Sequence, residues 1–302
     1  MPGTGFTTGK ISTIGSCGKN EISGNRKKRE RKNQNRTSEA GIRSGQPNVP
    51  GRLVVCVPGI ASSHPVRNFC VASENAAIFI RLMFIGHFAV ALAAKRVAPQ
   101  TSLGTLFAAA QLPDVIWPLL VLSGVEKVEI HPGDTAFTPL NFISYPWSHS
   151  LLMVTLTGTV AGLLYAAKAK YPTGGFVVTL LAVSHWLLDW ISHRPDLPLY
   201  PGASPLLGLG LWNSIPSTML IEGSMFLVGI GLYASFTQSK DRIGRYAFWS
   251  LMIFLAAIYS ADRFSPPPSS AEAIGWVGVV GTGILLAWAE WVDRHRGISL
   301  TA

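Results

Sequence analysis

The chain has few charged residues, and this shortage narrows what it can be. Asp, Glu, Lys and Arg make up 14% of its 302 residues, against about 25% in an ordinary soluble domain. Apolar residues make up 48%, and many of them stand in long uninterrupted runs. The composition excludes an ordinary soluble domain and indicates a membrane protein.

Cysteine is also scarce, and it is confined to one part of the chain. The three cysteines, Cys17, Cys56 and Cys70, all precede residue 83. The rest of the chain can therefore form neither a disulfide nor a bond between a thiolate and a metal. A metal ion held there needs nitrogen and oxygen ligands.

Most of the chain also lacks an excess of positive or negative charge. Residues 1–52 carry 11 Lys/Arg and 3 Asp/Glu, whereas residues 83–302 carry 12 of each sign. The net charge of +9 thus belongs wholly to the first 82 residues. Residues 83–302 give no electrostatic reason to expect a nucleic-acid partner.

Two regions follow from this division. Residues 1–82 are rich in Gly, Ser, Asn and Lys/Arg without apolar periodicity, so we predict a disordered basic extension. Its run "RKKRERK" suits nucleic acid or acidic lipid headgroups, but we interpret it as a solvated tail. A misassigned start is the alternative, with translation beginning at Met83, because nothing after Met83 depends on the extension. Residues 83–302 are predicted to form one helical membrane domain.

Apolar segments of helical length predict the fold class of this domain: all-α and polytopic. About 20 residues cross a hydrocarbon core of about 30 Å, and most segments approach that length. We expect about six to seven membrane segments, the first of which is short and either re-entrant or limited to one leaflet. The segments cover residues 84–97, 103–123, 150–167, 175–192, 215–236, 246–260 and 274–292.

Lys and Arg in the connections predict the orientation, because cytoplasmic loops carry the excess. If the segments alternate in direction, nine of the 12 Lys/Arg after residue 82 share one side. We therefore expect a multi-pass protein of the bacterial inner membrane with a cytoplasmic C-terminus. The loops near 124–148, 193–214 and 261–273 would lie outside. The basic extension would lie outside too, which conflicts with the rule unless the first segment is re-entrant or the extension is not made.

Ionisable side chains interrupt the apolar segments at related depths. A charged residue at the centre of a bilayer costs roughly 2.5–3.5 kcal/mol, so such residues mark functional sites. In the alternating topology these residues all fall in the outer half of the membrane or near its centre. They are His87, Asp114, His149, His185, Asp189 and Glu222.

The types and spacing of these residues favour a metal ion. His185 and Asp189 are four residues apart, about 40° on one helical face, so both can reach one ion. Asp114 lies between Pro113 and Pro118, where a broken helix frees backbone groups and a polar cavity tends to form. Three histidines and two aspartates suit zinc or another divalent ion. Five ligands exceed the number usual for one catalytic zinc, so a two-metal site stays open.

Four stretches, in this order, carry a resemblance to a known family: "GHFAVALAAKR", "LPDVIWP", "PWSHSLL" and "SHWLLDWISHRPDLP". They resemble the YdjM-like family of bacterial membrane-bound proteins, which are regarded as metal-dependent hydrolases. The resemblance implies a divalent-metal hydrolase embedded in the inner membrane. Carried over residue by residue, it implies the ligands His87, Asp114, His149, His185 and Asp189.

The other roles rest on position in the sequence. Glu222 lies outside the family motif and is our own candidate for the general base, or for a partner of a ligand histidine. Ser148 and Ser184 each precede a ligand histidine and are expected to donate hydrogen bonds that support the ligands. His193, with Arg194 and Asp196, is expected to support the ligands or to face the substrate.

Three functions remain open on the sequence alone. The leading hypothesis is hydrolysis of a lipid-linked or phosphoester substrate at the outer face, with membrane lipids as partners. A transporter or permease can use the same His and Asp residues to bind a cation or relay protons. A scaffold with a structural metal is the third, since structural sites are closed by four ligands whereas catalytic sites keep an open position.

Overall fold

The computed structural model describes residues 54–56, 70–72, 84–261 and 264–299. The predicted disordered extension therefore lies outside the described residues, except for two three-residue strands. These are β1 (Val54–Cys56) and β2 (Cys70–Ala72), which pair antiparallel.

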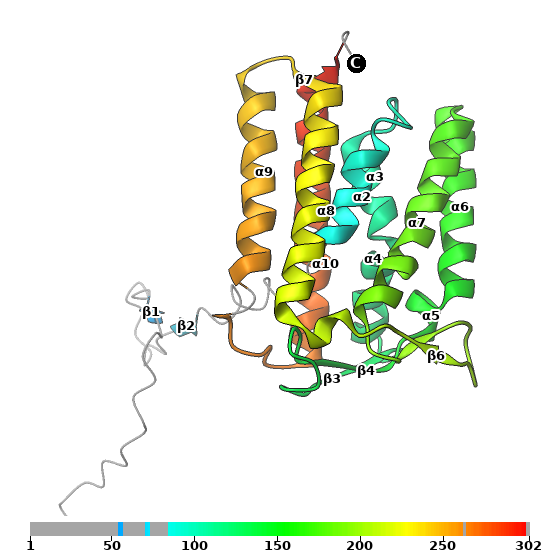
Figure 1. Ribbon diagram of the computed structural model, residues 1–302, viewed down its shortest axis with the longest axis vertical. Coiled ribbons are helices and arrows are strands. Elements are labelled where there is room, and N and C mark those ends of the chain that lie inside the picture. The colour runs from blue at the N-terminus through cyan, green and yellow to red at the C-terminus, as the bar shows by residue number, and fades with distance from the viewer. Residues whose placement is uncertain (1–53, 57–69, 73–83, 262–263, 300–302) are drawn as a thin grey trace, which may run out of the picture. The chain divides into compact units, whose positions relative to one another are not determined.

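Helices dominate the remainder, and the predicted all-α polytopic fold is confirmed. Within the described ranges, five helices are long and apolar enough to cross a membrane, and they run in roughly parallel directions in Figure 1. They are α6 (Leu151–Ala169), α7 (Pro172–Ser192), α8 (Ile215–Phe236), α9 (Arg242–Ala261) and α10 (Ala271–Arg294). The first predicted segment is short, as expected, and forms α2 (Ile85–Ala94).

The second predicted segment is broken rather than continuous. It forms α3 (Leu103–Ala110) and α4 (Leu112–Leu122), which meet at an angle of 59°. Gln111 joins them with ψ near 15°, outside the helical range. Pro113, at the start of α4, has no backbone N–H to continue the ladder of α3. If the bent pair counts as one span, the total rises to six.

The connections gather at the two ends of the helices. Figure 1 shows β3 (Lys127–Ile130), β4 (Leu140–Ser144) and β6 (Leu206–Leu207) at one end. At the opposite end β7 (Thr237–Ser239) pairs with β8 (Arg296–Ile298). The loops predicted to share a side therefore do share an end. The short elements of the first end also include α5 (Pro146–His149), β5 (Leu197–Pro198) and the 3-10 helix η1 (Leu211–Asn213).

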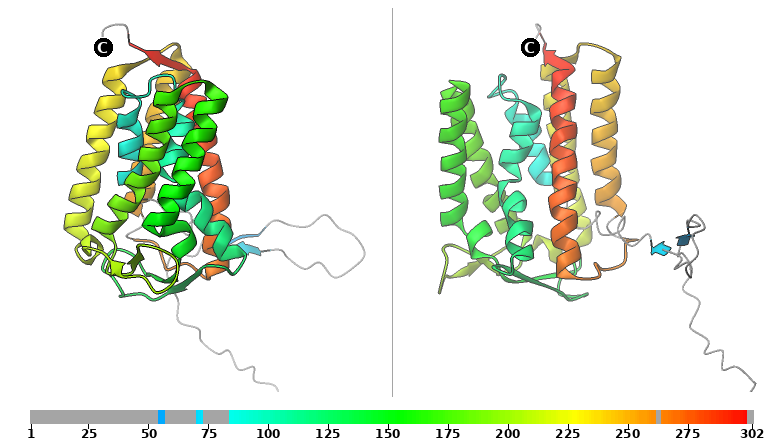
Figure 2. Two further views of the ribbon diagram at one scale, coloured as in Figure 1. Left: turned by 90° about the vertical axis from the view of Figure 1, so that its right-hand side faces the viewer. Right: turned by 180° about the vertical axis from the view of Figure 1, so that it is seen from behind.

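Small residues let the helices approach closely, as is usual in membrane proteins. A Cβ added to Gly158 of α6 would lie 2.6 Å from the Cβ of Ala182 in α7, and one added to Gly175 would lie 2.6 Å from the Cβ of Ala166. The two helices form a tight hairpin, seen in front in the left view of Figure 2. Buried residues recur along α7 every three to four positions, which turns His185 and Asp189 inward.

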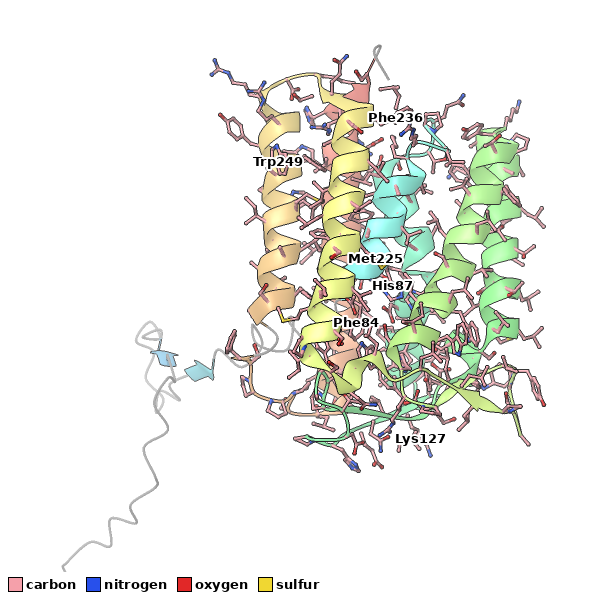
Figure 3. All side chains as sticks on the ribbon, in the orientation of Figure 1. Phe84, His87, Lys127, Met225, Phe236 and Trp249 are labelled. Carbon is pink, nitrogen blue, oxygen red and sulfur yellow. The ribbon has the colours of Figure 1, made fainter. Side chains whose placement is uncertain are left out.

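The short helix α2 is enclosed by α3, α7 and α8. Its contact with α8 depends on Gly229, where an added Cβ would lie only 2.6 Å from the carbonyl oxygen of Ala89. His87 of α2 is 3% exposed. Figure 3 shows His87 inside the group of helices, with Phe84 nearer the end that carries Lys127.

Candidate metal centre

The five predicted ligands come from four helices and meet in one place. α2 supplies His87, α4 supplies Asp114, α5 supplies His149, and α7 supplies both His185 and Asp189. Four of these side chains are at most 5% exposed, while that of Asp114 is 22% exposed. Asp114 is therefore the member of the set most accessible from its surroundings.

The distances between the donor atoms match those around a metal ion. His87 Nε2 lies 3.2 Å from Asp189 Oδ1, and His185 Nε2 lies 3.2 Å from Asp189 Oδ2. His149 Nε2 lies 3.4 Å from Asp114 Oδ1. Two ligand atoms about 2.1 Å from a tetrahedral ion are about 3.4 Å apart. The spacing thus suits nitrogen and oxygen ligands of a small divalent cation.

Two overlapping groups of three ligands can be drawn, each with its donor atoms within 4.8 Å of one another. One is His87, His185 and Asp189, and the other is Asp114, His149 and His185. Asp189 links them, because its Oδ2 also lies 3.8 Å from His149 Nε2. A carboxylate has two oxygens and can bridge two ions, whereas one imidazole nitrogen binds one ion. The geometry therefore accommodates a single ion or a pair that shares Asp189.

The break between α3 and α4 orients His185. The carbonyl oxygen of Ala110, the last residue of α3, lies 2.8 Å from His185 Nδ1. A carbonyl can only accept, so Nδ1 carries the proton of this hydrogen bond. The neutral ring then presents the lone pair of Nε2 to Asp114 and Asp189. Backbone carbonyls commonly fix a metal-ligating histidine in this way.

A buried carboxylate that the sequence reasoning missed orients His149. Glu126, only 1% exposed, accepts hydrogen bonds from the backbone N–H groups of Trp147 and Ser148 at 2.8 and 2.9 Å. The Ser148 hydroxyl donates to Glu126 Oε2 at 2.6 Å and lies 2.7 Å from His149 Nδ1. A hydroxyl has one proton, so Nδ1 donates to Ser148 and Nε2 faces the centre. Ser148 therefore contacts His149 as expected, but it accepts this hydrogen bond instead of donating it.

Ser184 behaves differently, and the expectation that it supports His185 is wrong. Its hydroxyl donates to the carbonyl oxygen of Leu181, one turn earlier in α7, at 2.7 Å. Serine within a helix often bonds its own backbone in this manner. His185 is held by Ala110 instead. A serine before a histidine therefore does not by itself predict their contact.

These contacts test whether a cation fits. Nε2 of His149 and Nε2 of His185 lie 3.2 to 3.9 Å from carboxylate oxygens, so each nitrogen must share either a proton or a bound cation with them. Among the described residues, neither ring nitrogen of His87 makes a hydrogen bond, and Asp189 Oδ2 makes none either. A divalent cation would satisfy all of these atoms. The residues present fit a metal ion with N and O ligands.

A small cavity borders the centre and has room for about one water molecule. It has about 20 Å³ of space for the centre of a water molecule, and Asp114, His149, Asp189 and His193 line it. Phe84, Trp117, Leu140 and Phe142 supply its apolar surface. The candidate centre therefore faces a compartment with both polar and apolar walls.

His193 reaches this cavity from the end of α7 and is held from behind. Its Nδ1 lies 3.0 Å from Asp196 Oδ1 and 3.2 Å from the hydroxyl of Tyr145. Tyr145 donates to Asp196 at 2.8 Å, and Arg194 pairs with the other oxygen of Asp196 at 3.1 Å. Burial, and then the charge of Asp196, raises the pKa of Tyr145 well above its ordinary value. Tyr145 therefore remains a donor at physiological pH, and the predicted grouping of His193, Arg194 and Asp196 is present.

Glu222 of α8 lies on the other side of His87. The two side chains line a second cavity, between α2, α7 and α8, together with Gly86 and Ser192. Within the described part of the chain, neither carboxylate oxygen of Glu222 makes a hydrogen bond. The residue is 4% exposed, and its carboxylate faces the backbone N–H groups of Ile85 and Gly86 in the first turn of α2. This position places Glu222 behind a ligand rather than in the cavity next to the centre.

Fold and site together define a polytopic helical membrane protein with a buried His/Asp cluster that can hold a metal ion. The family follows from comparison of the sequence. Residues 83–265 match the model of the YdjM inner membrane protein family, so the chain belongs to that family. The comparisons with curated proteins and with solved structures return no match. The helix α10 lies beyond the matched residues.

Proposed function

We propose that the protein is a metal-dependent hydrolase of the bacterial inner membrane that acts on a lipid-linked or phosphoester substrate. The observation that supports this most is the orientation of His149 and His185. Glu126, through Ser148, and the Ala110 carbonyl turn both Nε2 atoms toward the carboxylates of Asp114 and Asp189. Such an arrangement is the one that metal-ligating histidines adopt, with the second ring nitrogen held by a backbone carbonyl or another hydrogen-bonding group.

The ligands would be His87, Asp114, His149, His185 and Asp189, with zinc as the expected ion among the divalent cations that nitrogen and oxygen ligands suit. A bound divalent ion supplies a hydroxide nucleophile at neutral pH and polarises the scissile oxygen. Asp114 is the most accessible ligand and borders the cavity. It is therefore the residue that a substrate oxygen meets first.

His193 would contact the substrate from the opposite wall of this cavity. Because Asp196 and Tyr145 hold its Nδ1, its Nε2 remains for a substrate oxygen. The aromatic walls exclude bulk water from the same space. Positioning by an oriented, buried side chain is a general source of rate enhancement.

Glu222 would position His87 rather than act on the substrate directly. The cavity that the two share has about 30 Å³ of space for the centre of a water molecule, enough for one ordered water. A water there links the carboxylate to His87 Nδ1 and fixes the ring. The general-base role that we also considered would require Glu222 to reach the cavity beside Asp114.

Metal content tests the proposal directly. The full chain, purified in detergent, is expected to contain about one or two divalent ions per molecule. His185→Ala and Asp189→Ala should lower the content about tenfold or more. His131→Ala is the matched control, because His131 is 51% exposed in the loop between β3 and β4 and should leave it unchanged. Equal and negligible metal in all four proteins would contradict the proposal.

Activity separates hydrolysis from transport by the same residues. A panel of phosphoester and lipid substrates should be turned over in detergent, and a chelator should abolish the turnover. Metal flux across vesicles that depends on a proton gradient, without turnover of any substrate, would instead identify a transporter.

A further inference from the structure

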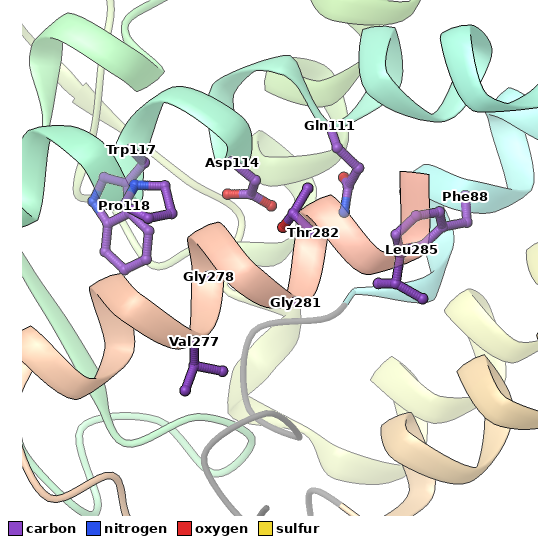
Figure 4. A pocket seen from close by; sticks show the side chains of 10 residues that line it. All are labelled: Phe88, Gln111, Asp114, Trp117, Pro118, Val277, Gly278, Gly281, Thr282 and Leu285. Carbon is purple, nitrogen blue, oxygen red and sulfur yellow. The ribbon is translucent and has the colours of Figure 1, made fainter. Parts of the chain in front are cut away.

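A groove on the outer face of α9 is far larger than the cavities near the candidate centre. Its volume is about 510 Å³, within the range of about 300–1,000 Å³ that is usual for small-molecule sites. The cavity between α4 and α10, which Gln111, Asp114 and Thr282 line in Figure 4, has only about 30 Å³ of space for the centre of a water molecule. The groove therefore has room for a larger ligand, whereas that cavity does not.

One stripe of side chains on α9 forms most of the groove. Its members, spaced four, three and four residues apart, lie within about 60° on one helical face and are Arg242, Tyr246, Trp249 and Ile253. The last three are 69%, 46% and 65% exposed. Trp291 of α10, 46% exposed, borders the groove from the neighbouring helix, and the right view of Figure 2 shows α9 beside α10. In a membrane-spanning helix these exposed apolar side chains face the lipid.

The stripe changes character along the helix in the same order as a phospholipid does along its length. Arg242 is the first residue of α9. Tyr246, Trp249 and Ile253 follow about 6, 10 and 16 Å further along the axis. The headgroup region of each leaflet is roughly 5–7 Å deep, and Trp and Tyr are enriched where it meets the hydrocarbon. Figure 3 shows Trp249 in the half of the helices that carries Phe236, the last residue of α8. The cation thus lies at the depth of a phosphate, the aromatic rings at that of the glycerol, and the aliphatic side chain at that of an acyl chain.

The cation at the mouth of the groove has no acidic partner. Among the described residues, no ion pair involves Arg242 or the exposed Arg245 one turn on. The adjacent Asp241 is engaged elsewhere, because it lies 2.7 Å from His295 Nδ1 and accepts a hydrogen bond from the backbone N–H of Gly244 at 2.7 Å. A free guanidinium can bind a phosphate with two parallel N–H···O bonds. The mouth therefore favours an anionic headgroup over a zwitterionic one, whose own cation would be repelled.

We propose that the groove binds one anionic phospholipid from the leaflet at the end that carries β7 and β8. The phosphate pairs with Arg242, the glycerol region packs against Tyr246, Trp249 and Trp291, and one acyl chain continues along Ile253. The groove shares no lining residue with the cavities at the candidate centre, so this binding does not depend on the proposed function.

Lipid affinity of the full chain in detergent tests the headgroup contact. Native mass spectrometry measures the dissociation constants of dioleoylphosphatidylglycerol and dioleoylphosphatidylcholine, which have the same acyl chains. The wild type should bind the first about tenfold more tightly, and Arg242→Gln should lose this preference. Arg96→Gln is the matched control, because Arg96 is exposed at the same end of the helices and does not line the groove; it should keep the preference. Equal affinity for the two lipids in the wild type, a preference that survives Arg242→Gln, or the same loss in both variants would overturn the proposal.

A second pair of variants tests the apolar contact. Trp249→Ala removes an aromatic wall and should weaken the binding of phosphatidylglycerol about fivefold. Trp276→Ala is its control, because Trp276 is 56% exposed near the opposite end of α10 and should bind the lipid like the wild type. Glycerol phosphate, which lacks acyl chains, should not displace the lipid. Displacement by glycerol phosphate, or equal binding by the two tryptophan variants, would mean that Arg242 binds a free phosphate without the groove. All four variants change exposed side chains, so each is expected to fold.

Discussion

Two serines occupy equivalent places in the sequence, each just before a candidate ligand, yet only one contacts its histidine. Ser148 bonds both Glu126 and His149, whereas Ser184 bonds the backbone of its own helix. We therefore expect Ser148→Ala to weaken zinc binding about 10- to 100-fold, as is typical when a supporting contact is lost. Ser184→Ala should bind zinc like the wild type. Competition titration against a zinc chelator measures both, and equal affinities would refute the assignment.

The individual ligands could be predicted from the sequence, but the groups that orient these ligands by hydrogen bonding could not. His87, Asp114, His149, His185 and Asp189 stand out because ionisable side chains are rare in apolar segments. Glu126 gave no such signal, since it belongs to a connection between segments where charged residues are ordinary. Its burial depends on the turn that brings α5 over it. The contact between the Ala110 carbonyl and His185 depends on the break between α3 and α4. The sequence indicated this break only as a helix interrupted by prolines.

The helices themselves were predictable because hydropathy fixes where each can lie in a bilayer. Observed bounds differ from the predicted ones by a few residues, as at the starts of α7, α9 and α10. The contacts between helices were not predictable, since they depend on which small residues face one another. Gly229 illustrates this: its neighbour Ala89 is 140 positions away in the chain, in a helix that also carries His87.

The close contact between Gly229 and Ala89 makes the position of α2 sensitive to substitutions in α8. Gly229→Val should destabilise the fold by about 1–3 kcal/mol through overpacking and should weaken metal binding by displacing His87. Gly231→Val in the same helix is the control, because a Cβ there meets no described atom within 4 Å. Denaturant unfolding in detergent and zinc titration test the pair. If both variants match the wild type, α2 does not depend on this approach.

The positions of the basic residues relative to the two ends of the helices predict how the protein is oriented in its membrane. The β3–β4 loop and the β7–β8 pair lie at opposite ends of the helices (Figure 1). Nine of the 12 Lys/Arg after residue 82 lie at the end that carries β7 and β8, either in its connections or in the helix turns next to them. Basic residues are retained in the cytoplasm, so the end that carries β3 and β4 is expected to face the periplasm, together with the candidate centre.

Site-directed labelling tests this orientation, and the absence of cysteine after Cys70 makes it straightforward. The three native cysteines are first replaced by serine, and Glu129→Cys and Arg294→Cys then each introduce one thiol. The native side chains at these two positions are 56% and 73% exposed. A maleimide that cannot cross the inner membrane should label the Glu129→Cys protein in cells with a permeabilised outer membrane. It should label the Arg294→Cys protein only after the inner membrane is disrupted. The reverse result would place the centre on the cytoplasmic side, and the substrate would then have to be sought there.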